Sequence, residues 1–164
     1  MGALATFDLP SGQFVLRRAE IRDVPDLVAL MSADALGEAR DGIACAEDLN
    51  VYERAFALIE QDPSQLLVVV VSPEDRVVGT LQLSFIPGLA RRGTLRAQIE
   101  AVRIAAALRG GGLGTEMLRW AIAEAGRRGC SLVQLTTDKA RGDAIRFYQR
   151  LGFAASHEGM KLKV

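Results

Sequence analysis

The sequence predicts a mixed α/β (α+β) domain, in which a central sheet carries helices on both faces. Three observations support this prediction. An apolar run at residues 66–71 is followed by a turn and by a second strand-like run at 77–86, the pattern of a hairpin. A strand pattern, a glycine-dense turn and a helix pattern then follow one another between residues 98 and 128. Strand and helix patterns continue to alternate up to residue 164.

The first half of the chain combines one strand pattern with two helix patterns. Residues 1–12 include Pro10-Ser11-Gly12 and are expected to form a loose leader, and residues 14–18 alternate apolar and basic residues as a first strand does. Asp23 precedes Val24-Pro25, an N-cap followed by an early proline, which predicts a helix to about Leu36. A second helix is expected from about residue 47 to 61, where Asp62-Pro63 ends it.

In the second half, we expect strands at 98–104 and 131–136, helices at 115–128 and 142–151, and a last strand in which Met160, Leu162 and Val164 alternate with lysines. Strict alternation along 98–104 predicts two faces for that strand. Ile99, Ala101 and Arg103 are expected on one face, and Glu100, Val102 and Ile104 on the other.

Size and composition indicate one domain spanning residues 1–164. The chain has a mass of 17.7 kDa, 49% hydrophobic and 24% charged residues, and is large enough to bury a core. Its 20 basic and 20 acidic residues cancel, so no net charge recruits nucleic acid. A single histidine, His157, excludes a multi-histidine metal site, and no metal is expected. Without a signal-peptide pattern or a membrane-length apolar run, we expect a cytoplasmic protein with no membrane partner.

The glycine-dense turn Arg109-Gly-Gly-Gly-Leu-Gly114 is the strongest indication of a binding site. Glycines let backbone N–H groups approach an anion, and the first turn of the following helix adds unpaired N–H donors. A P-loop requires Lys and Ser or Thr after the last glycine, but Thr115-Glu116 follows here. The dinucleotide fingerprint fails as well, because no three glycines have its spacing.

What remains is the pattern Arg/Gln-x-x-Gly-x-Gly/Ala, filled by Arg109, Gly112 and Gly114. A second pattern, A-x-x-F-Y-x-x-x-G-F, is filled by Ala144, Phe147, Tyr148, Gly152 and Phe153. In this order and separation, the two motifs resemble those of the GCN5-related N-acetyltransferase (GNAT) superfamily, which uses acetyl-CoA. The resemblance implies a mostly antiparallel central sheet with a V-shaped split between two central strands.

The resemblance also implies where acetyl-CoA binds. The pantetheine arm is expected between the two splayed strands, bonded to the backbone of Val102, Arg103 and Ile104, with a bulge near Ile104 presenting an N–H to the acetyl oxygen. The diphosphate is expected on N–H groups of the loop formed by Arg109, Gly110, Gly111, Gly112, Leu113, Gly114 and Thr115. Arg141 stands where the family often has Asn, so it either bonds the cofactor or faces solvent.

Two residues are candidates for the proton transfers. Glu100 is the candidate base, since the family often uses a carboxylate on this strand, and its expected face leads through Val102 and Ile104 to the glycine loop. Its structural alternative is a solvated or salt-bridged glutamate. Tyr148 occupies the family's tyrosine position beside the thiol of CoA and is the candidate acid; the alternative is a tyrosine packed in the core.

The leading hypothesis is an acetyl-CoA-dependent N-acetyltransferase acting on a small primary amine. Acceptor specificity is expected from residues 23–61 and from the loop 87–96, whose Arg91, Arg92 and Arg96 favour an acceptor carrying a carboxylate or phosphate. The alternatives are acetylation of a protein N-terminus or lysine, a non-catalytic acyl-CoA-binding module, and a phosphate-binding domain unrelated to CoA. Exposed strand edges permit a homodimer, and His157 is expected near the cleft if the last strand pairs.

Overall fold

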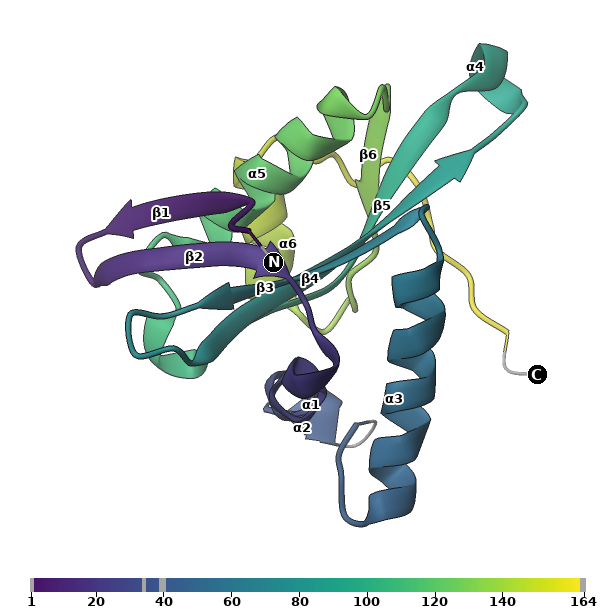
Figure 1. The fold of residues 1–164 in the computed structure, drawn as a ribbon. Helices are drawn as coiled ribbons and strands as arrows, with labels where there is room; N and C mark the ends of the chain where they lie inside the picture. Colours follow the sequence, from purple (N-terminus) through teal and green to yellow (C-terminus); the bar gives the residue numbers. More distant parts are fainter. Residues whose placement is uncertain (1, 34, 39–40, 163–164) are drawn as a thin grey trace.

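The computed structural model describes residues 2–33, 35–38 and 41–162. Within them, six strands form one sheet in the order β1-β2-β3-β4-β5-β6 (Figure 1). Each pair is antiparallel except β5 and β6, which are parallel. The sheet is therefore mixed and mostly antiparallel, as predicted. The strands are β1 Ala5–Leu9, β2 Gly12–Arg18, β3 Gln65–Val71, β4 Val77–Pro87, β5 Leu95–Ile104 and β6 Leu132–Leu135.

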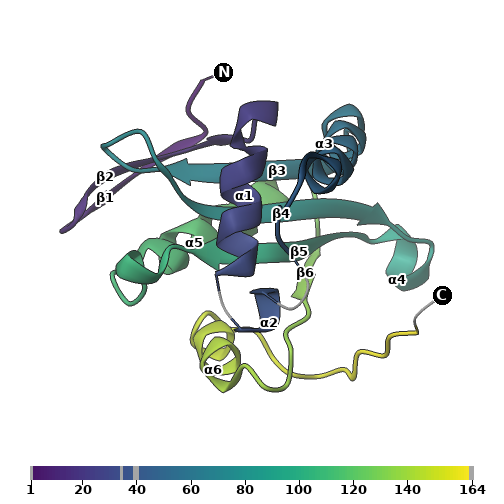
Figure 2. The same cartoon turned by 90° about the horizontal axis from the view of Figure 1, so that it is seen from below.

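Helices cover both faces of this sheet. One face carries α5 and α6, and the other carries α1 and α3, with α1 crossing in front of the strands in Figure 2. The short helix α2 follows α1 and contacts it. No helix among the described residues has the length and apolar character needed to cross a membrane. The α-helices are α1 Val24–Ser32, α2 Ala35–Glu38, α3 Ala46–Gln61, α4 Ala90–Gly93, α5 Leu113–Arg127 and α6 Gly142–Arg150; short 3₁₀ turns occupy Ile21–Asp23 and Ala106–Leu108.

The alternation of side chains along the strands produces two hydrophobic clusters. The larger one lies between the sheet and the helices α5 and α6, and it buries Leu81 and Leu83 of β4 together with Met117 and Leu118 of α5. The smaller one lies between the sheet and the helices α1 and α3. It contains Val24, Leu27, Val28, Phe56, Val69 and Val71. Because β3 contributes to both clusters, its sequence is an uninterrupted apolar run.

Both ends of the chain differ from the expectations. The predicted loose leader contains β1, which pairs with β2 through a tight turn at Pro10-Ser11, and Phe7 is only 8% exposed. The predicted last strand is absent from the described residues: 154–162 are irregular, Met160 is 95% exposed, and Val164 lies outside the described residues. The alternation of apolar residues and lysines is not sufficient for a strand, because a strand must also pair with the edge of a neighbouring strand.

A bulge in β5 overturns the expected division of that strand into two faces. The register between β4 and β5 shifts between Thr80 and Gln82, and Ala101, opposite the shift, has a left-handed φ of 52°. The extra residue places Val102 and Ile104 against the same cluster as Ile99. Glu100 is therefore on the opposite face from Val102 and Ile104, and the bulge lies at Ala101 rather than near Ile104.

The sheet splits beyond residue 99. Among the described residues, strand β6 pairs with Arg96–Ile99 of β5 alone, through Leu132–Leu135. Strand β5 continues to Ile104 beside β4, while the chain leaves β6 and enters α6. A split thus lies between β5 and β6 and exposes one side of the β5 backbone. It differs from the prediction in one respect: β6 is the edge strand of the described sheet rather than a central one, because no described strand pairs with its other side.

Candidate active site

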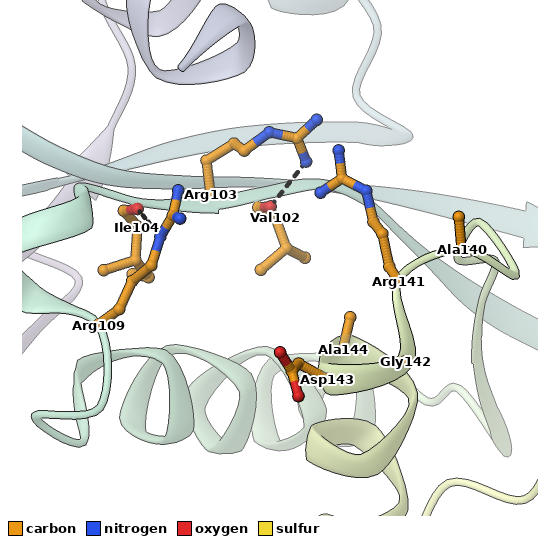
Figure 3. A pocket seen from close by; sticks show the side chains of 9 residues that line it. All are labelled: Val102, Arg103, Ile104, Arg109, Ala140, Arg141, Gly142, Asp143 and Ala144. Carbon is orange, nitrogen blue, oxygen red and sulfur yellow. Dashed lines mark hydrogen bonds between the residues drawn. The ribbon is translucent and has the colours of Figure 1, made fainter. Parts of the chain in front are cut away.

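A cavity of about 380 Å³ lies where β5 continues past β6. It is bounded by the end of β5 and the first turn of α6 (Figure 3). The residues that line it are Val102, Arg103, Ile104, Arg109, Ala140, Arg141, Gly142, Asp143 and Ala144.

The floor of the cavity is the exposed backbone edge of β5. The Ala105 N–H donates to the Val78 carbonyl of β4 at 2.8 Å, so alternation turns the polar groups of Val102 and Ile104 away from β4. Both carbonyls accept bonds from arginine side chains: Arg103 Nη1 donates to Val102 at 2.9 Å, and Arg109 Nε donates to Ile104 at 3.2 Å (Figure 3). The β5 edge therefore presents two carbonyl acceptors on the cavity side, and each is bonded to an arginine.

The glycine loop forms the N-terminus of α5. Gly112 is the N-cap with a left-handed φ of 93°, and no side chain in the described part of the chain caps the first N–H groups of the helix. These donors have no intrahelical acceptor and carry the positive end of the helix dipole. A Cβ on Gly114 would lie 3.5 Å from Phe147 Cζ of α6, so the loop packs closely against the helix that bounds the cavity.

The charge around the cavity suits an anion. Arg103, Arg109 and Arg141 contribute positive charge from three different segments, and Asp143 is the acidic residue of the lining. The Asp143 carboxylate is paired with Arg146 of its own helix. Cationic side chains and uncapped N–H groups together fit a diphosphate, and the β5 edge that β6 leaves uncovered fits an amide-containing arm.

Tyr148 lies on α6, half-buried next to the cavity. Its ring packs at 5.3 Å from the Phe147 ring and at 6.0 Å from the Phe153 ring. Burial raises the pKa of the Tyr148 phenol, and the charges of Arg103 and Arg141 act in the opposite direction. The phenol is therefore protonated at neutral pH and lies within electrostatic reach of two cavity arginines.

Glu100 is exposed on the face of the sheet that carries α1 and α3, opposite Gln82, and it does not line the cavity. Arg91 and Arg92 are exposed in a left-handed turn at the β4–β5 hairpin tip. His157 is exposed in the irregular C-terminal segment, where its Nδ1 lies 2.8 Å from Ser156 Oγ.

The structure thus gathers five of the expected cofactor-binding residues around one cavity: Val102, Arg103, Ile104, Arg109 and Arg141. The residues Gly110 to Thr115 are adjacent in the loop but are not part of its lining. Sequence reasoning did not assign Ala140, Gly142, Asp143 and Ala144 to the site. Their signal was positional, since they immediately precede or begin the motif that contains Tyr148.

Comparisons with known proteins agree with this geometry. The model of the acetyltransferase (GNAT) family matches residues 34–153. A solved structure from Bacillus halodurans C-125, described as a transcriptional regulator, is 43% identical with a TM-score of 0.86, covering 92% of this chain and 99% of that one. A Trypanosoma brucei acetyltransferase is 26% identical with a TM-score of 0.73, covering 92% of this chain and 99% of that one.

A curated relative matches a shorter stretch. The aminoalkylphosphonate N-acetyltransferase of Salmonella typhimurium (strain LT2) is 38% identical over 60 residues, which are 37% of this chain and 39% of that protein. The aligned part therefore spans well under half the length of the Salmonella protein. The family model, in contrast, covers most of this chain and includes the loop and the segment that contains Tyr148. The chain belongs to the acetyltransferase (GNAT) family.

Proposed function

We propose that this protein transfers the acetyl group of acetyl-CoA to the primary amine of a small molecule. Membership in the family indicates an acyltransferase. The identity of the cofactor and the chemical class of the acceptor are what we propose here. The observation that carries it is the open β5 edge, whose Val102 and Ile104 carbonyls face a cationic cavity beside an uncapped helix N-terminus.

The chain's own groups suit the parts of the cofactor. Acetyl-CoA, when bound, supplies an acetyl group activated as a thioester. The N–H groups of residues 112–115 and the Arg109 guanidinium bind the diphosphate, because the helix dipole and the side-chain charge both favour an anion there. The backbone of Val102 and Ile104 binds the amide-containing arm as an added strand. Arg141 contributes charge from the opposite wall.

Two proton transfers fall to Glu100 and Tyr148. An alkylammonium with a pKa of roughly 10 is not a nucleophile, so a base must take its proton. The exposed Glu100 carboxylate accepts that proton through water, since it lies on β5 only two residues before Val102, which lines the cavity. The Tyr148 Oη donates a proton to the departing sulfur, and its raised pKa keeps that proton available at neutral pH.

The test is release of free thiol from acetyl-CoA in the presence of an amine panel that includes aminoalkylphosphonates. We expect turnover with at least one amine, and a large loss of kcat in Glu100→Gln and Tyr148→Phe without loss of acetyl-CoA binding. Tyr52→Phe is the matched control, because Tyr52 is the chain's other tyrosine and bonds Gly42 and Asp41 away from the cavity. Full turnover in both site variants would remove these residues from the mechanism.

The remaining alternatives give different outcomes. Acetylation of peptides but of no small amine would show that the acceptor is a protein or peptide. Tight CoA binding without acetylation of any amine or peptide would indicate a binding module. Calorimetry with CoA, dephospho-CoA and ATP separates a CoA site from a general phosphate site, which would bind ATP as well as CoA.

A further inference from the structure

A row of polar side chains crosses four strands at a single register. Gln65 of β3 pairs with Ser84 of β4, Ser84 with Gln98 of β5, and Gln98 with Gln134 of β6. Ser84 Oγ donates to Gln65 Oε1 at 2.7 Å, and Gln134 Nε2 donates to Gln98 Oε1 at 2.7 Å. Their chain neighbours Leu66, Leu83, Ala97 and Val133 belong to the large core cluster. The polar row therefore lies on the opposite face, together with Glu100.

This row departs from the rest of the same face. Where α1 and α3 cover the sheet, the strands present apolar residues such as Val69 and Val71. Between α1 and α4, the strands β4 and β5 continue without a helix in front of them (Figure 2). At its β3 end the row lies beside α3, because Gln65 lines a small hollow with Phe56 and Ile59 of that helix. Its part on β4 and β5, which no helix covers in Figure 2, is suited to contact water or a polar ligand rather than a second layer of core.

The row leaves hydrogen-bonding capacity for a ligand. The bond between Gln134 and Gln98 uses one polar atom of each amide. The Gln98 Nε2 donor and the Gln134 Oε1 acceptor remain, and neither is bonded within the described part of the chain. Gln98 is only 9% exposed, so its amide is held in place by its surroundings rather than moving freely in water. Two oriented amides of this kind can recognise hydroxyl, amide or acid groups.

Opposite charges lie at the two ends of this stretch of β5. Glu100 follows Gln98 by two residues and Arg96 precedes it by two, so all three side chains share a face. At 3.3–3.4 Å per residue, the Cα atoms of Arg96 and Glu100 are about 13 Å apart. Arg96 Nε is buried and has no hydrogen-bond partner among the described residues. A buried donor without an acceptor is costly, which points to an acceptor group that a ligand brings.

We propose that this face binds the acceptor, and that the acceptor is an elongated dipolar amine. Its amine lies at Glu100, its polar middle lies over Gln98 and Gln134, and its other end carries a carboxylate or phosphonate that pairs with Arg96. The proposal rests on the proposed function, in which Glu100 is the base. The separation along β5 favours a linker longer than two carbons between the amine and the acid.

The test compares amines that differ only in the terminal acid. We expect kcat/KM for 8-aminooctanoate to exceed that for octylamine by roughly tenfold or more, the effect of one charge-assisted hydrogen bond. β-Alanine, which is too short, should gain nothing over propylamine. In Arg96→Gln the preference for the acid disappears through KM while octylamine turnover is unchanged, and Arg96→Lys retains part of it. Arg76→Gln, in the exposed turn between β3 and β4, is the matched control and keeps the wild-type preference.

The possible outcomes separate the two proposals. Acetylation of alkylamines without any preference for the acid-bearing analogues overturns the dipolar acceptor and leaves the acetyltransferase function standing. Retention of the preference in Arg96→Gln overturns the role of Arg96. If no amine of either kind releases thiol, the proposed function and this inference both fail. Thermal unfolding of each variant shows whether a loss of activity reflects a loss of fold.

Discussion

Replacing Gly112 by alanine tests the cofactor loop and the backbone that forms it. Gly112 has φ 93° and ψ −18°, and a Cβ there would meet only Leu9 Cδ2, at an ordinary 3.5 Å. The cost is therefore that of a left-handed backbone for an L-residue, about 1–2 kcal/mol. With an m-value of about 2 kcal/mol/M, the urea midpoint should fall by roughly 0.5–1 M.

Binding should suffer as well, because relaxation toward negative φ turns the first N–H groups of α5 away from the anion. Loss of one charge-assisted hydrogen bond raises the Kd for acetyl-CoA by about tenfold or more, which calorimetry measures. Gly126→Ala is the control: it lies in the same helix, and its Cβ meets no atom within 4 Å. In Gly126→Ala, the free energy of unfolding should rise by up to about 1 kcal/mol, and the Kd for acetyl-CoA should not change. If Gly112→Ala lost stability but kept wild-type affinity, the loop would not hold the diphosphate.

Two further predictions concern stability. Burial raises the pKa of Asp23, but hydrogen bonds from Arg17 at 2.6 and 2.9 Å and from a backbone N–H outweigh it and hold the pKa below its usual value. Asp23→Asn should therefore lower the free energy of unfolding by about 3 kcal/mol near pH 7. The difference in urea midpoint between wild type and variant should shrink as the pH falls below about 4, because the wild-type carboxylate becomes protonated over that range. A difference that does not change with pH would contradict this. In Gly79→Ala, the new methyl would lie 3.0 Å from Ile104 Cδ1 and 3.1 Å from Met117 Sδ. Such overpacking should lower the free energy of unfolding by about 1 kcal/mol and the Tm by about 2–4 °C. Displacement of Ile104 should also weaken acetyl-CoA binding. An unchanged Tm would show that Ile104 and Met117 move aside without a cost in stability.

Periodicity predicted most of the helices and strands, because most of them bury one face and expose the other. The helix expected at 115–128 is α5, and the apolar run at 66–71 is β3, buried from both sides. The two errors at the chain ends have the same physical origin. Strand formation depends on a partner edge, which β2 supplies to residues 5–9 and which no described strand supplies to residues 154–162. A local pattern carries no information about that edge.

The parts of the site whose backbone conformation is set by a local motif could be predicted from the sequence. The parts whose position depends on tertiary packing could not. The glycine loop indicated an uncapped helix start, which is a local property. The prediction of which face Glu100 occupies was wrong, because Ala101 adopts a left-handed backbone conformation. Alanine rarely adopts this conformation, so the sequence did not indicate it. The approach of Arg141 and Asp143 to the end of β5 depends on how α6 packs, which no single stretch of sequence encodes.

The arginine bonds to Val102 and Ile104 have a consequence for solubility. A strand that has lost its neighbour presents unsatisfied backbone groups, and such edges recruit strands from other chains and promote aggregation. By donating to these two carbonyls, Arg103 and Arg109 keep the gap in the sheet from acting as a template for foreign strands. On the proposed function, the extended arm of the ligand displaces these two bulky cations when it enters the gap, whereas a stray polypeptide must also overcome their charge and volume.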